Sequence, residues 1–215
     1  MTDIFQEVDE DLRRDRAAQL WQRYRLAILG AAGFVVAATG CYVFWQDYQH
    51  RQQQALGARF ADAATLAEGD QAKAVAAYEA LGGNGSQGYP LLARFGAAGL
   101  EAKGTDKAAG IAALKAIAAD SSVPTVYRDL ATLQAAYFDV DTAQPADIIA
   151  RVEPLTIAPN PWRFSALEVT ALAKLKSGDQ DAARKLYQQL ADDLDAPQSI
   201  RARAAEILGA FRHQG

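Results

Sequence analysis

The sequence predicts an all-α fold in which helical hairpins stack into a solenoid, preceded by a single N-terminal transmembrane helix. Three observations lead to this prediction. Residues 26–45 carry no charged side chain. Apolar residues in the rest of the chain recur at helical spacing, and no stretch alternates apolar and polar residues as a strand does. Turn residues separate the helical segments at a nearly constant interval, which indicates a repeated structural unit.

The uncharged run from Leu26 to Trp45 is 20 residues long. About 20 apolar residues, roughly 30 Å of helix, are needed to cross the hydrocarbon core of a bilayer. Aromatic residues flank the run on both sides, with Trp21 and Tyr24 before it and Tyr48 after it, as expected at membrane interfaces. We therefore predict a transmembrane helix over residues 26–45. It divides the chain into an arm, residues 1–25, and a domain, residues 46–215.

Three other interpretations of this run remain open. It could be a buried helix of a soluble domain, although 20 uncharged residues is long for one. It could be a cleaved signal peptide, but such apolar regions usually span about 7–15 residues and follow a short basic segment. A lipoprotein would be cut before Cys41, the single cysteine, yet Ala38 stands where a branched apolar residue is expected and Tyr42 continues the apolar run. We favour an anchor that is retained.

Arginine residues indicate the orientation of the anchor. Five of them precede the span, whereas only Arg51 and Arg59 follow it closely. The five are Arg13, Arg14, Arg16, Arg23 and Arg25. Because basic residues stay on the cytoplasmic side, we expect a cytoplasmic N-terminus. The arm is amphipathic, so it either lies on the cytoplasmic leaflet, docks on a cytoplasmic partner, or is a frayed tail whose arginines only set the topology.

Helices are expected throughout the domain. A loop is expected over residues 82–90, which contain four glycines and a proline. The predicted helices cover residues 47–67, 72–81, 91–103, 107–119, 125–139, 146–155, 162–177, 181–194 and 198–211.

The turns inside the hairpins recur at a fixed period. Gly69, Gly104, Asp141 and Gly178 are separated by 35, 37 and 37 residues. A helical hairpin that repeats about every 34 residues is the signature of the tetratricopeptide class. At equal distances after three of these turns stand residues that we expect in the core, and they are Ala74, Tyr78 and Leu81; Ala109, Ala113 and Ala116; and Ala183, Tyr187 and Leu190. An ordinary helical bundle with fortuitous spacing is the alternative.

The layout of the whole chain resembles one family. An acidic and then arginine-rich arm (Phe5 to Arg14) runs through Leu20-Trp21-Gln22-Arg23-Tyr24 into one apolar span, and degenerate hairpins follow, ending with Leu172 to Asp179. This is similar to the YfgM-like, ancillary SecYEG translocon subunit family. The resemblance implies a bacterial inner-membrane protein with a periplasmic C-terminal domain. It also implies association with the SecYEG translocon and with a membrane-anchored periplasmic peptidyl-prolyl isomerase chaperone, and a part in handing over exported chains.

The sequence points to binding rather than to catalysis. The chain carries 22 Lys and Arg against 26 Asp and Glu, a net charge of −4, and no basic stripe indicates nucleic-acid binding. His50 and His213 are far apart in the sequence and have no metal-type partner at helical spacing. We expect no cofactor and no metal site. A scaffold for another inner-membrane or envelope complex is the alternative function.

The candidate contact residues lie on the helices expected to line the concave side of the solenoid. An aromatic and arginine mixture is typical of interface hot spots, although aromatic residues at helix starts also pack in cores. The candidates are Arg94, Tyr127, Arg128, Trp162 and Arg163. In the span, small residues would allow close helix packing, and these are Ala27, Gly30, Ala31 and Gly33.

Overall fold

The structure is a computed structural model that describes the backbone of residues 3–104 and 106–212. Side chains are described for residues 33–104 and 106–211, and for residues 21, 23, 25, 26, 29 and 30. The chain divides into two compact units, Met1–Ala55 and Leu56–Gly215. We describe each unit by itself.

The first unit is formed by helix α1 (Asp3–Leu66) up to Ala55. The predicted arm is helical from Asp3, and its side chains before residue 21 lie outside the described part. Within the residues that the structure describes, no helix is long and apolar enough to cross a membrane. The predicted transmembrane helix is therefore not shown, and four residues of that span (27, 28, 31 and 32) have no described side chain. The described large apolar residues of this unit are exposed, and they are Trp21, Leu26, Leu29, Phe34, Val35, Val36, Tyr42, Val43, Phe44, Trp45 and Tyr48.

The second unit begins with the last turns of α1 and is all-helical in its described residues. Its further helices are α2 (Gln71–Gly82), α3 (Gly88–Lys103), α4 (Lys107–Ala119), α5 (Thr125–Asp139), α6 (Pro145–Val152), α7 (Arg163–Lys176), α8 (Gln180–Asp192) and α9 (Gln198–Arg212), with a 3₁₀ turn η1 (Glu153–Leu155) after α6. This confirms the predicted all-α class.

Three predicted boundaries differ from the structure by two residues or more. The helix expected over residues 181–194 ends at Asp192. The loop expected over residues 82–90 is shorter, because α3 already begins at Gly88. Pro90 fits there, since a helix's first turn has no intrahelical use for the missing N–H. The helix expected over residues 146–155 ends at Val152 and tightens into η1. Pro154 explains this end, because it cannot donate the next α-helical hydrogen bond.

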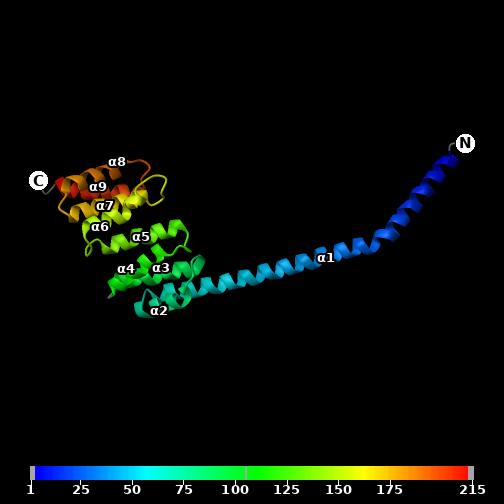
Figure 1. The fold of residues 1–215 in the computed structure, drawn as a ribbon, viewed down its shortest axis with the longest axis horizontal. Helices are drawn as coiled ribbons and strands as arrows, with labels where there is room; N and C mark the ends of the chain where they lie inside the picture. Colours follow the sequence, from blue (N-terminus) through cyan, green and yellow to red (C-terminus); the bar gives the residue numbers. More distant parts are fainter. Residues whose placement is uncertain (1–2, 105, 213–215) are drawn as a thin grey trace. The chain divides into compact units, whose positions relative to one another are not determined.

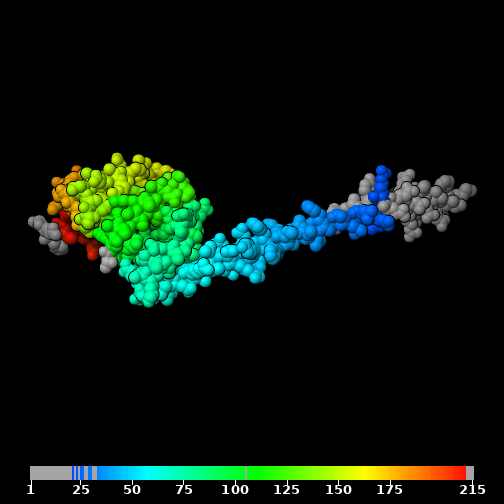
Figure 2. Space-filling model, turned by 60° about the horizontal axis from the view of Figure 1, so that its bottom comes forward, coloured from blue at the N-terminus to red at the C-terminus, as the bar shows by residue number. Residues whose placement is uncertain are grey.

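Successive helices pack against one another as a stack of hairpins (Figure 1). The end of α1 pairs with α2, α3 with α4, α5 with α6 and α7 with α8, while α9 closes the stack. The odd-numbered helices also contact one another, α3 with α5, α5 with α7 and α7 with α9. In the space-filling view the hairpins follow one another in chain order, from cyan through green and yellow to red (Figure 2). Helices that are adjacent along the chain thus supply nearly all the packing contacts, as in other repeat proteins.

The core residues stand at constant distances, in residues, after the N-cap of each even-numbered helix. The caps are Asp70, Asp106, Gln144 and Asp179. The three aspartates each accept a hydrogen bond from the backbone N–H three residues later, at 3.0 to 3.2 Å. Residues four, eight and eleven positions after the cap face the core in every hairpin: Ala74, Tyr78 and Leu81; Gly110, Leu114 and Ile117; Ile148, Val152 and Leu155; Ala183, Tyr187 and Leu190.

The predicted core residues of α4 were therefore displaced by one position. Ala109, Ala113 and Ala116 were expected in the core, but Gly110 and the residues that follow it at the core spacing are buried instead. The reason is the length of the turn. One extra residue separates Gly104 from the capping Asp106, whereas the other two glycines directly precede their capping aspartates. Counting from the glycine consequently gave a register that was one residue early.

Helices α3 and α4 approach each other closely at Gly110. A Cβ added there would lie 2.5 Å from the Ala98 carbonyl oxygen and 2.7 Å from the Ala102 Cα, which are backbone atoms that no rotamer change can move. By contrast, a Cβ added at Gly99 in α3 would meet no atom within 4 Å.

We expect Gly110→Ala to destabilise the domain by about 1–3 kcal/mol, because the added methyl group overpacks a backbone contact. Gly99→Ala is the matched control, and it should stabilise the domain by about 0.5–1 kcal/mol through helix propensity alone. Urea unfolding followed by circular dichroism measures both changes. Equal effects of the two substitutions would contradict the close contact.

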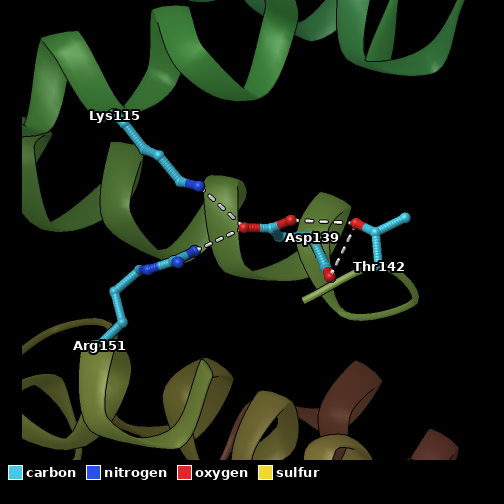
Figure 3. A network of polar contacts seen from close by, with 4 residues as sticks. All are labelled: Lys115, Asp139, Thr142 and Arg151. Atoms are coloured by element: carbon cyan, nitrogen blue, oxygen red, sulfur yellow. Dashed lines mark hydrogen bonds and ion pairs between the residues drawn. The ribbon is translucent and has the colours of Figure 1, made fainter. Parts of the chain in front are cut away.

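A buried carboxylate joins the second and third hairpins of this stack (Figure 3). Asp139, at the end of α5, receives one hydrogen bond to Oδ2 from Lys115 Nζ at 2.9 Å and another from Arg151 Nη1 at 3.1 Å. The Thr142 hydroxyl donates to Oδ1 at 3.0 Å. Burial alone would raise the pKa of Asp139, but these donors outweigh burial and hold the pKa below its ordinary value. Asp139 therefore stabilises the fold in its ionised form.

We expect Asp139→Asn to lower the free energy of unfolding at neutral pH by about 1–3 kcal/mol, because two cations lose the negative charge of their buried acceptor. A carboxylate with a lowered folded-state pKa contributes stability that is present above its unfolded pKa, about 3.9, and is lost as the pH falls through the folded value. The difference between wild type and variant should therefore shrink below about pH 4. Urea unfolding at several pH values tests this. Asp62→Asn, which alters an exposed carboxylate, is the control, and a wild-type advantage that persisted in acid would contradict the assignment.

Candidate functional site

A groove of about 470 Å³ lies on the side of the stack formed by the odd-numbered helices. Helices α3 and α5 form its walls, and Ala67, in the turn after α1, and Tyr78 of α2 complete the lining. Its lining is aromatic and otherwise small or uncharged, apart from one lysine. The lining residues are Ala67, Tyr78, Phe95, Gly96, Gly99, Leu100, Lys103, Gln134, Tyr137 and Phe138.

Two glycines of α3 shape the groove. A Cβ added at Gly96 would lie 3.0 Å from the Tyr78 ring, so a glycine lets this tyrosine pack against the helix. The Tyr78 ring also packs against Phe60 in a tilted arrangement, with a centroid distance of 5.3 Å. At Gly99 a Cβ would meet no atom within 4 Å, so the missing side chain leaves open space. The two glycines therefore leave space in the α3 wall of the groove, beside Phe95 and Leu100.

Tyr137 is held in the groove by a polar chain that spans three odd-numbered helices. Its hydroxyl donates to Glu168 Oε2 on α7 at 2.7 Å. The same carboxylate accepts two hydrogen bonds from Arg203 on α9, at 2.7 Å from Nε and 2.8 Å from Nη2. Burial is the main cause that raises the pKa of Tyr137, and the neighbouring Glu168 raises this pKa further. The phenol therefore stays protonated as a donor, and its ring is fixed against the groove.

The groove suits binding of apolar side chains. Its volume falls in the range of about 300–1,000 Å³ that is usual for ligand pockets. Its lining residues include no carboxylate, histidine, cysteine or serine. In the described part of the chain, no group of three or more His, Cys, Asp or Glu side chains could hold a metal ion. His50 is exposed on α1, and His213 lies outside the described residues.

The predicted contact residues lie elsewhere. Arg94 lies on the opposite side of α3, where its Nη1 donates to the Gly85 carbonyl and to Asp120 Oδ2, each at 3.0 Å. Its guanidinium therefore tethers the loops that flank the second hairpin. Tyr127 is 38% exposed at the start of α5, and the neighbouring Arg128 donates to the Thr125 hydroxyl at 2.9 Å.

Trp162 and Arg163 lie at the start of α7. The Trp162 indole N–H donates to the Val126 carbonyl of α5 at 2.9 Å. Trp162 also packs on the apolar core between α5 and α7. Arg163 lies over the Phe164 ring at 4.2 Å and approaches Asp193 at 3.8 Å. The contacts of Trp162 hold the start of α7 in place, which agrees with the core-packing alternative for this residue.

Of the residues expected to pack in the membrane helix, Gly30 and Gly33 are exposed on α1. A Cβ added at either would meet no atom within 4 Å. Ala27 and Ala31 lie outside the described side chains.

A family comparison agrees with this geometry. The sequence model of the tetratricopeptide repeat-like domain family matches residues 18–207, which is most of the chain. The chain belongs to the tetratricopeptide repeat-like domain family. Domains of this family are typically non-catalytic modules that bind other proteins. Comparisons with curated proteins and with solved structures gave no match.

The groove residues of this tetratricopeptide-like chain are not among the predicted contact residues. Phe95 directly follows the candidate Arg94, and Phe138 follows Tyr137. The available signal was the combination of an aromatic residue with two glycines one turn apart in α3, because glycine inside a helix often marks a close packing or binding position. The prediction uses arginine as the marker of an interface, and the arginine of α3, Arg94, lies on the side of the helix away from the groove.

We expect Tyr137→Phe to lower the free energy of unfolding by about 1.5–3 kcal/mol, because a buried carboxylate loses a donor while the ring remains. Tyr127→Phe removes a hydroxyl from an exposed ring and should change stability by less than about 0.5 kcal/mol. Thermal and urea unfolding of both variants provide the measurement. Similar losses in the two variants would show that the bond to Glu168 contributes nothing specific.

Proposed function

We propose that this protein is a membrane-anchored, non-catalytic binding subunit of the bacterial inner membrane. In this proposal it associates with the SecYEG translocon and with a membrane-anchored periplasmic peptidyl-prolyl isomerase chaperone. It assists the export or folding of secreted proteins by holding protein segments on its tetratricopeptide-like domain.

The aromatic groove between α3 and α5 is the observation that carries the binding role. Aromatic side chains supply large apolar contact areas, and they dominate the energetics of protein interfaces. Phe95, Phe138 and Tyr137 line one groove, and the polar chain to Arg203 holds Tyr137 in a single orientation. A preorganised surface loses less conformational entropy on binding, which favours affinity.

The sequence supports the anchor and its orientation. Residues 26–45 are uncharged and long enough for a bilayer, and five arginines precede them. This arrangement would place the N-terminus in the cytoplasm and the repeat domain in the periplasm. The layout of arm, span and degenerate repeats supports the translocon and the chaperone as partners, because the YfgM-like family shares that layout.

Site-specific photocrosslinking in intact bacterial membranes tests the proposal. We would place a photoreactive amino acid at Lys103, on the rim of the groove, and at Gly33 in the predicted span. We expect the groove probe to capture a chaperone or a transiting secreted chain, and the span probe to capture a translocon subunit. A probe at Ala150, an exposed residue of α6, is the control.

Capture of fixed subunits of a respiratory or envelope complex from both positions, without transiting chains, would favour the scaffold function instead. Equal capture by the Ala150 control would show that the groove is not the binding surface.

A further inference from the structure

A second hollow lies on the opposite side of α3 from the aromatic groove. It has a volume of about 250 Å³ and separates α2 from α4. Its walls are mostly glycine and alanine, and two glutamates lie on it. The lining residues are Glu79, Gly82, Gly83, Arg94, Ala97, Ala98, Glu101, Ala113, Ala116 and Ile117. We call this hollow the outer cleft.

The repeat register identifies the equivalent of the outer cleft in the next hairpin. There Lys115 is nine positions after the cap Asp106, Asp139 is five positions before the cap Gln144, and Arg151 is seven positions after it. Lys115 and Arg151 both donate to Asp139, so this junction is filled by its own cations (Figure 3).

The same positions one repeat earlier hold different residues. Glu79 is nine positions after the cap Asp70, Glu101 is five positions before Asp106, and Ala113 is seven positions after it. Glu101 therefore takes the place of Asp139, so the central carboxylate is kept. Glu79 stands in place of Lys115, and Ala113 in place of Arg151. Space is left where the next junction has the Arg151 side chain.

No cation neutralises the two glutamates within the part of the chain that the structure describes. There, neither Glu79 nor Glu101 forms an ion pair or accepts a side-chain hydrogen bond. Arg94 lines the cleft, but its guanidinium is already bonded to Asp120 and to the Gly85 carbonyl. Burial, together with the charges of Glu79 and Asp106, raises the pKa of Glu101. A cation that entered the cleft would relieve this repulsion.

We propose that the outer cleft binds the lysine or arginine side chain of a basic segment of a partner protein. The small residues of the walls leave room for the aliphatic stem of such a side chain. Glu79 and Glu101 then receive its charged group, as Asp139 receives Lys115 and Arg151 within this chain. This surface is separate from the aromatic groove, so it gives the domain a second contact of different chemistry.

A labelled peptide tests the proposal on the full-length protein in detergent micelles. The probe is a fluorescein-labelled, alanine-based helical peptide with two arginines four residues apart, and the control peptide has glutamines in their place. Fluorescence anisotropy at low salt should show binding of the arginine peptide only. Glu79→Gln with Glu101→Gln should weaken that binding roughly tenfold or more, since two charge-assisted contacts are lost.

Two further variants locate the effect. Glu153→Gln with Glu206→Gln removes the same charge from exposed positions outside the cleft, and it should bind the arginine peptide as the wild type does. Ala113→Leu fills the cleft without changing charge, and it should also weaken binding while circular dichroism shows a folded protein.

The proposal is overturned if the arginine peptide fails to bind, if the glutamine peptide binds equally well, or if the Glu153 and Glu206 variant loses as much affinity as the cleft variant. It is also overturned if Ala113→Leu binds unchanged. Calcium that protects the cleft glutamates from carbodiimide labelling, when the arginine peptide does not, would make the cleft a metal site and would equally reject the proposal.

Discussion

The stack depends on how closely the two helices of each hairpin approach, and the residue four positions after the helix cap controls that approach. It is alanine in α2 and α8, glycine in α4 and isoleucine in α6, and in each case it is buried. In α2, α4 and α8 a capping aspartate fixes where the helix begins and thereby determines which residue occupies this position. A local hydrogen bond at a helix start consequently decides which side chains fill the core several turns later.

The two sides of the stack have different chemistry because α3 presents different residues to each. Toward α5 it presents Phe95 and two glycines, which leaves an aromatic groove. Toward α2 and α4 it presents Ala97 and Glu101, which leaves a small cleft with an uncompensated charge. One helix thus separates an apolar surface from an acidic one. A binding domain with both can distinguish partners by two independent criteria.

The sequence predicted the fold well where the signals were local. The limits of α4 and α5 were predicted without error, since a capping aspartate, a proline and a terminal turn mark them. The core register of α4 was wrong by one residue because the turn, rather than the cap, was used as the origin. The groove was not predicted, because its residues come from separate helices and share no spacing. The donors to the buried carboxylates of Asp139 and Glu168 were missed for the same reason, since those pairs are 12 to 35 residues apart.

The chain of hydrogen bonds from Tyr137 through Glu168 to Arg203 has a consequence for cooperativity. In a repeat protein each unit normally contacts only the neighbouring units, so the ends can unfold locally without disturbing the middle. Here one carboxylate connects α5, α7 and α9, and it skips the even-numbered helices between them. If the terminal helix α9 opened, Glu168 would lose the hydrogen bonds from the Arg203 guanidinium. The Tyr137 side chain at the groove would then be held less firmly. The C-terminal half of the array is thereby bound into one cooperative unit, and the order of the binding surface depends on whether the last helix is docked.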